Sequence, residues 1–223
     1  MQPQPAPLQL TKEDIFVNQI YRGLDEQFLY LDKECDTIIE KIEKENKRKL
    51  KSGEIKVLPN SYHSENLWEH KVFEPFVNFV MQQMWNILNW QGYNLDGRVP
   101  MLQECWVQEF PEEGGFHDIH IHSNNIISGF YFLKCNHETS KPHFHDPRPG
   151  KMMVDLLPKD KTKISSASSQ IHYPVKPGQF IFFNSWMPHS YSHHKGKEKF
   201  RFIHFNMQAT TDPGNIKNVE DKN

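Results

Sequence analysis

The chain has 223 residues, enough for one domain with a substantial core. Its 26 Lys and Arg nearly balance its 28 Asp and Glu, and a net charge of −2 gives no electrostatic case for a nucleic-acid partner or an anionic membrane. Only 37% of the residues are hydrophobic, but 16 Phe can build an aromatic core.

The three cysteines, Cys35, Cys105 and Cys135, are odd in number and far apart. This count argues against a disulfide framework and favours a reducing, cytoplasmic setting. The sequence shows no basic and apolar leader and no apolar run long enough to span a bilayer, so we expect no membrane association. The oligomeric state stays open, a homodimer included.

The first half of the chain predicts two helices. We expect a flexible segment over residues 1–11 and a short strand at residues 15–17. Apolar residues at helical spacing then predict one helix near residues 31–51 and a second that starts at Pro75 and closes at Gly92.

After residue 100 the pattern changes to short aromatic or β-branched runs separated by Gly and Pro. Helices followed by many strands predict an α+β domain with an antiparallel barrel or double-sheet jelly roll. We expect this single domain to cover residues 12–208, with a loop at 157–169 and a flexible tail at 209–223. The expected strands are 101–110, 116–122, 126–135, 151–156, 170–173, 179–184 and 200–207.

The most informative stretch is residues 115–124, which contains three of the 13 histidines. On a regular strand, Asp118, His120 and His122 share one face. Two imidazoles on one face can bind one metal ion, and His189, at the end of a later strand, can supply a third ligand. His143 and His145 form a second His-x-His pair. We rank it lower because no strand pattern surrounds it.

Arg201 lies twelve residues after His189, among apolar residues of an expected strand. A buried guanidinium needs an anionic partner. That partner is either a ligand carboxylate, held by two parallel hydrogen bonds, or an internal Asp or Glu.

Taken together, these pieces resemble the Fe(II)/2-oxoglutarate-dependent oxygenase superfamily, over about residues 15–208. More narrowly, the chain looks like the poorly characterised "putative 2OG-Fe(II) oxygenase" subgroup found in marine bacteria and phages. The residues that carry it are His120–Asn124, Ser128–Leu133, Asp146–Arg148, Pro177–Phe180, Ser185–His189, Arg201–Asn206 and, before the second helix, Asn60–Trp68.

This resemblance implies a double-stranded β-helix, or jelly roll, with the N-terminal helices packed on its larger sheet. It also implies that Fe(II) lies near the three histidines and that 2-oxoglutarate chelates the iron. Arg201, helped by Tyr131, would bind the distal carboxylate. The resemblance further implies O2 as a reactant and hydroxylation of a primary substrate, which the sequence does not identify.

One position departs from the superfamily, which usually binds iron with two His and one carboxylate. Two residues after His120 stands His122, not Asp or Glu. We expect His120, His122 and His189 to be the ligands, with Asp118 as the alternative source of a carboxylate.

Two other functions compete with an oxygenase. A three-His site also suits a zinc or cupin-type enzyme that does not use 2-oxoglutarate. A jelly roll can also be a non-catalytic binding module, in which case the histidines would be packing or surface groups.

Overall fold

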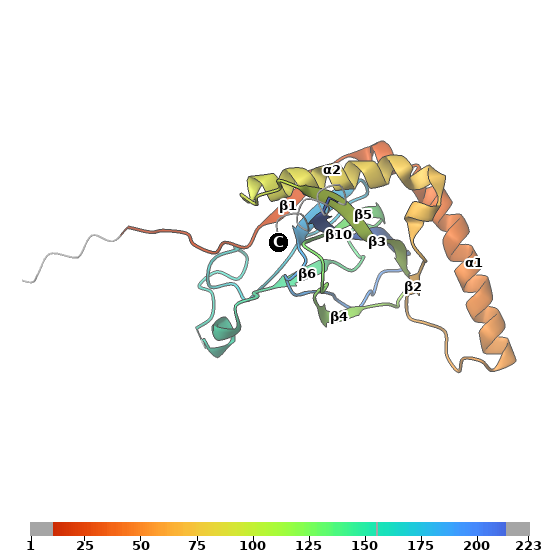
Figure 1. Ribbon diagram of the computed structural model, residues 1–223. Coiled ribbons are helices and arrows are strands. Elements are labelled where there is room, and N and C mark those ends of the chain that lie inside the picture. Colours follow the sequence, from red (N-terminus) through yellow and green to blue (C-terminus); the bar gives the residue numbers. More distant parts are fainter. Residues whose placement is uncertain (1–10, 155, 213–223) are drawn as a thin grey trace, which may run out of the picture.

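The structure, a computed structural model, describes residues 11–154 and 156–212. Its strands form two antiparallel sheets stacked as a double-stranded β-helix, as expected (Figure 1). The larger sheet has the order β1 (Ile20–Leu24), β8 (Gln179–Asn184), β5 (Ile127–Lys134), β10 (Phe200–Thr211), β3 (Arg98–Phe110) and β2 (Tyr62–His63). The smaller sheet has the order β4 (His117–His120), β9 (His189–Tyr191), β6 (Pro142–His145) and β7 (Gln170–His172).

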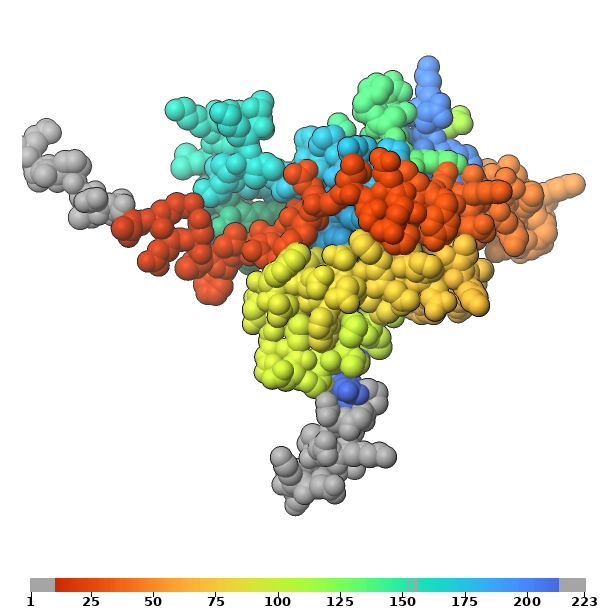
Figure 2. Space-filling view, turned by 90° about the horizontal axis from the view of Figure 1, so that it is seen from above, coloured from red at the N-terminus to blue at the C-terminus, as the bar shows by residue number. Residues whose placement is uncertain are grey.

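Two long helices cover the outer face of the larger sheet, α1 (Leu31–Ser52) and α2 (Glu74–Trp90) (Figure 1). Both confirm the sequence prediction. Gly53 ends α1 in the left-handed conformation that glycine adopts most easily. In the view from above, the yellow α2 lies across the centre of the molecule (Figure 2). Single-turn 3-10 helices lie at Glu26–Phe28, Leu67–Glu69, Lys71–Phe73 and Pro149–Met153.

Alternation along the larger sheet separates two cores. On β10, Ile203 and Phe205 pack with the helices, whereas Phe200 and Phe202 point between the two sheets. The helix-facing core contains residues of α1, α2, β3, β5 and β8, and the inner core is mostly aromatic. Both faces of β10 are buried from Phe200 to Met207, so each side chain in this part faces either the helices or the smaller sheet.

Five strand assignments differ from the sequence prediction. Residues 15–17 are irregular and exposed, and the first strand begins at Ile20. The strand predicted at residues 151–156 is absent from the described part of that range, which begins inside a 3-10 helix and continues with exposed residues. Strands β2, β6 and β9 were not predicted, because each is only two to four residues long and contains histidine.

The edges of the predicted domain also shift slightly. Strand β10 continues to Thr211, beyond the predicted boundary at residue 208. The rest of the predicted tail, from residue 213, and residues 1–10 of the predicted N-terminal segment lie outside the described residues. Among the described residues, no helix has the length and apolar character needed to cross a bilayer.

Candidate metal centre

Three histidines from separate parts of the chain meet between the two sheets. His120 ends β4, His122 lies just beyond it, and His189 begins β9. Each offers a ring nitrogen, and these three nitrogens lie within 4.8 Å of one another. The structure therefore brings together the three residues that the sequence predicted as metal ligands.

An irregularity in β4 decides which side chains join this cluster. His117 pairs with Tyr191 and His120 pairs with His189, so three steps along β4 match two along β9. This bulge breaks the regular alternation on which the prediction about Asp118 rested. The Asp118 side chain is exposed and lies outside the cluster, while the His117 and His120 rings are 5.5 Å apart. The alternative in which Asp118 supplies a carboxylate ligand is not supported.

The hydrogen bonds of two histidines fix their tautomers. His120 Nδ1–H donates to the Asp118 carbonyl at 2.7 Å, and His189 Nδ1–H donates to the Met187 carbonyl at 3.0 Å. A carbonyl can only accept, so both Nε2 atoms keep a free lone pair. Such carbonyl contacts are the usual way in which a protein orients a metal-binding histidine.

The spacing of the nitrogens also fits a shared ion. Two nitrogens that each lie about 2.1 Å from one ion are roughly 3.0 to 3.4 Å apart. The distance from His122 Nε2 to His189 Nε2 is 3.2 Å. The cluster thus has the size of a coordination site.

Burial keeps the imidazoles of His122 and His189 neutral. It lowers the pKa of His189 to about 3 and that of His122 to about 4, and the neighbouring imidazoles lower both further. The rings of Phe130, Phe144 and Phe183 pack against His189 at centroid distances of 5.8, 6.3 and 4.7 Å. Since only a neutral imidazole binds a metal, this aromatic wall favours coordination.

Arg201 lies on the opposite side of the sheet from the cluster. Its side chain is fully buried against α1, where it forms ion pairs with Asp32, Asp36 and Glu109. The Nε–H donates to Glu109 at 2.7 Å. The buried Arg201 therefore satisfies its charge with protein carboxylates, the internal partner that the sequence had left open beside a ligand carboxylate.

Tyr131 belongs to the same helix-facing core as Arg201. Its hydroxyl donates to the Asp25 carbonyl at 3.0 Å, and its ring packs on Phe28, Phe76 and Phe180. Neither residue of the predicted carboxylate-binding pair thus reaches the cluster.

Sequence reasoning missed several neighbours of the histidines. His204 and Asn206 lie on the inner face of β10, and the His204 ring lies 4.6 Å from that of His122 and 4.4 Å from that of Trp106. Asn206 Nδ2 lies 3.1 Å from His122 Nδ1. The available signal was alternation: these two residues occupy the strand face opposite Arg201.

The second His-x-His pair lies apart from the cluster, on the smaller sheet. His143 sits opposite His172 on β7, with ring centroids 5.2 Å apart, and His145 Nε2 is 2.9 Å from the Ser190 hydroxyl. Both histidines lie on strand β6, so the ground for ranking the pair lower, the lack of a strand around it, does not hold.

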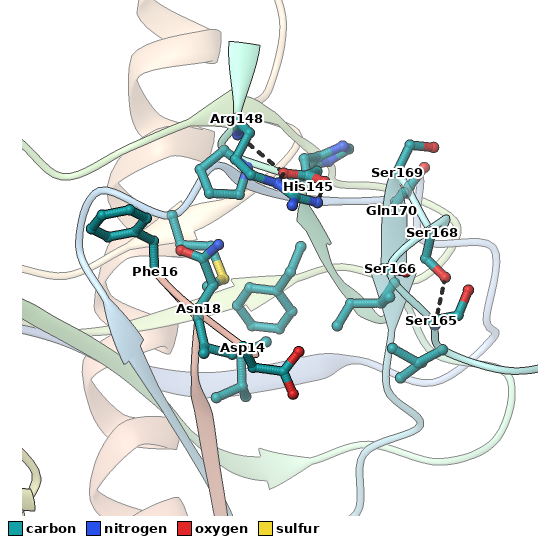
Figure 3. A pocket seen from close by; sticks show the side chains of 18 of the residues that line it. Asp14, Phe16, Asn18, His145, Arg148, Ser165, Ser166, Ser168, Ser169 and Gln170 are labelled. Atoms are coloured by element: carbon teal, nitrogen blue, oxygen red, sulfur yellow. Dashed lines mark hydrogen bonds and ion pairs between the residues drawn. The ribbon is translucent and has the colours of Figure 1, made fainter. Parts of the chain in front are cut away.

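A groove on the described surface lies apart from the three histidines, none of which lines it. It has a volume of about 850 Å³ and runs between the N-terminal segment, the end of β6 and the serine-rich stretch before β7 (Figure 3). Figure 3 shows around it His145, Arg148, Gln170 and the serines 165, 166, 168 and 169. Arg148 forms an ion pair with Asp146, which also lines the groove. Phe144 and Met187 line the groove and also contact His189, so they separate it from the metal ligands.

Comparison with known proteins places this geometry in context. Residues 104–206 match the family described as "Putative 2OG-Fe(II) oxygenase". This segment includes all three histidines of the cluster, Arg201 and Asn206. A search of curated proteins found no match.

Solved structures share the fold at low sequence identity. A Pseudomonas putida prolyl-4-hydroxylase is 11% identical with a TM-score of 0.50, and the match covers 86% of this chain and 93% of that one. A Trichoplax adhaerens prolyl hydroxylase, in complex with a hypoxia inducible factor peptide, is 9% identical with a TM-score of 0.51 and covers 85% and 83%. A Burkholderia pseudomallei oxidoreductase of the 2OG-Fe(II) oxygenase family is matched over 50% of this chain and only 46% of its own, at 8% identity and a TM-score of 0.37.

Proposed function

We propose, on the premise that residues 104–206 make this chain a relative of the 2OG-Fe(II) oxygenases, that it oxidises a substrate at an iron held by His120, His122 and His189. The default outcome of this chemistry is hydroxylation, with 2-oxoglutarate converted to succinate. The observation that carries the proposal is the convergence of three ring nitrogens inside a jelly roll of this family.

The residues present fit the metal. His120 and His189 present lone pairs fixed by carbonyl contacts, and a three-ligand site leaves positions open for other ligands. When bound, Fe(II) and 2-oxoglutarate would activate O2 and provide the electrons that reduce it. The chain itself supplies orientation through these carbonyl contacts and excludes water through the phenylalanines around His189.

The residues expected to bind the distal carboxylate of 2-oxoglutarate do not lie near the three histidines. Arg201 and Tyr131 are occupied on the helix side of the sheet. The hydrogen bonds and ring contacts of the three histidines include no Lys or Arg among the described residues. We therefore propose three residues as metal ligands and no residue as a partner for the distal carboxylate.

The same observation favours a second candidate, a three-His metalloenzyme that does not use 2-oxoglutarate. With no carboxylate ligand, the site carries one more positive charge than the usual two-His, one-carboxylate site. Zinc and cupin-type enzymes use such all-imidazole sites.

Binding followed by turnover separates the candidates. Fe(II) and 2-oxoglutarate are titrated without oxygen, and succinate is measured after air is admitted. We expect succinate from the native chain and none from His120→Ala or His189→Ala. The control is His137→Ala, whose side chain is 90% exposed. Fe(II) or Zn(II) binding without any 2-oxoglutarate binding would favour the second candidate, and no metal binding would refute both.

A further inference from the structure

His122 differs from the other two candidate ligands in what its second ring nitrogen touches. The Nδ1 atoms of His120 and His189 face carbonyls, whereas His122 Nδ1 faces the amide nitrogen of Asn206 at 3.1 Å. The same amide nitrogen donates to Glu104 Oε2 at 2.6 Å. Asn206 therefore links one candidate metal ligand to a carboxylate.

The orientation of the Asn206 amide is fixed from both ends. Its Oδ1 accepts from the Ser128 hydroxyl at 2.6 Å and lies 3.0 Å from His204 Nε2. Its NH2 group has two hydrogens, one for Glu104 and one for His122. All four hydrogen bonds of the amide are thus used, and Asn206 is fully buried. Turning the amide over would put its oxygen against the Glu104 carboxylate, acceptor against acceptor.

This orientation sets the tautomer of His122. Because Asn206 donates to Nδ1, neutral His122 carries its hydrogen on Nε2. That atom then donates to His189 Nε2 at 3.2 Å. The atom that would bind a metal is therefore protonated in His122, whereas in His120 and His189 it is a free lone pair.

We propose that Glu104 and Asn206 are positioning residues that make His122 a displaceable third ligand, with His120 and His189 as the two fixed ones. This inference rests on the proposed metal site. For His122 to coordinate, its hydrogen moves from Nε2 to Nδ1, the lone pair of Nε2 goes to the metal, and the Asn206 amide turns to accept from Nδ1. Glu104 opposes that turn, so it holds the third position open for other ligands.

A double-mutant cycle between Glu104 and His122 tests the proposal. Glu104→Gln keeps the side-chain shape but can donate to a turned Asn206 amide. The measured quantity is the Kd for Co(II), together with the visible absorption of the bound ion, which reports coordination number. We expect Glu104→Gln to tighten Co(II) binding by about 10-fold or more. Changes to residues that hydrogen-bond to metal ligands typically alter metal affinity by about this factor. In the His122→Ala background, the same change should have no effect.

A matched control keeps the test independent of folding. Glu112→Gln makes the same Glu-to-Gln change at an exposed carboxylate beyond the end of β3. It should leave Co(II) affinity within about twofold, while thermal melting reports any loss of stability in each variant. Equal Kd values and spectra for the native chain and Glu104→Gln would overturn the inference, although Co(II) binding that depends on His120 and His189 would keep the proposed function. A native chain that binds no Co(II) would overturn both.

Discussion

At the scale of single residues, Arg201 has a structural role, because its buried charge is paired with protein carboxylates. Its guanidinium is fully buried and is matched by Glu109, which is buried beside it, and by Asp32 and Asp36 of α1. Lys199 also contacts Glu109 at 2.9 Å. Such a network tolerates the loss of a partner poorly, because a buried carboxylate would lose most of its compensating charge.

We therefore expect Arg201→Met to lower the free energy of unfolding by about 3–5 kcal/mol. Adding Glu109→Gln should restore part of this loss, because the orphaned charge is removed with its partner. Arg48→Met is the control: Arg48 of α1 pairs with Glu45 and with Glu54 in solvent, and such exposed pairs contribute little to stability. Urea unfolding measures all three. Equal losses for Arg201→Met and Arg48→Met would contradict the assigned role.

The position of Arg201 also shows where prediction from sequence ends. The spacing of His120, His122 and His189 was sufficient to predict the cluster. The need of Arg201 for an anionic partner was also predictable, but the face of the sheet on which its side chain lies was not. Both faces of β10 are apolar, with Phe202 on one and Ile203 on the other, so hydrophobic alternation does not reveal which face meets the helices.

At the scale of one element, β4 depends on the turn that precedes it. Gly115 has φ +79°, and a Cβ there would overlap the Phe110 side chain. Its carbonyl accepts from His194 N–H at 2.8 Å. This tight turn leads into the bulge that sets His120 opposite His189. A bulge depends on one extra residue in a ladder, which a residue pattern does not reveal, so regular alternation wrongly grouped Asp118 with the ligands.

We expect Gly115→Ala to lower both stability and metal affinity. A left-handed backbone costs a non-glycine residue about 1–2 kcal/mol, and the overlap with Phe110 adds about 1–3 kcal/mol. Gly92→Ala is the matched control, since Gly92 has φ +82° but open space around its Cβ position. It should show the backbone cost alone and unchanged Co(II) affinity. Thermal melting and Co(II) titration report the two effects. A Gly115→Ala protein that binds Co(II) like Gly92→Ala would show that β4 is not placed by this turn.

For the molecule as a whole, the buried imidazoles predict how stability depends on pH. Burial lowers the pKa of His189 to about 3, and burial lowers the pKa of His117 and His122 to about 4. In the unfolded chain these groups take up protons near pH 6.5. Between these values the unfolded state binds more protons, so stability is fully present above pH 6.5 and is lost as the pH falls towards 4.

The carboxylate of Asp36 titrates below this pH window. The pKa of Asp36 is lowered from 3.8 because the hydrogen bonds from Arg201 and Lys134 outweigh the opposing effect of burial. The stability that this carboxylate contributes is therefore lost only below about pH 4. We expect metal-free protein to lose about 2 kcal/mol per buried histidine between pH 6.5 and pH 5, measured by urea unfolding at each pH. His189→Gln should flatten this slope, whereas His137→Gln, with its exposed ring, should leave it unchanged. If the native protein and His189→Gln lost stability equally as the pH falls, His189 would be protonated as easily in the folded chain as in the unfolded chain. The neutral imidazole that metal binding requires would then be absent.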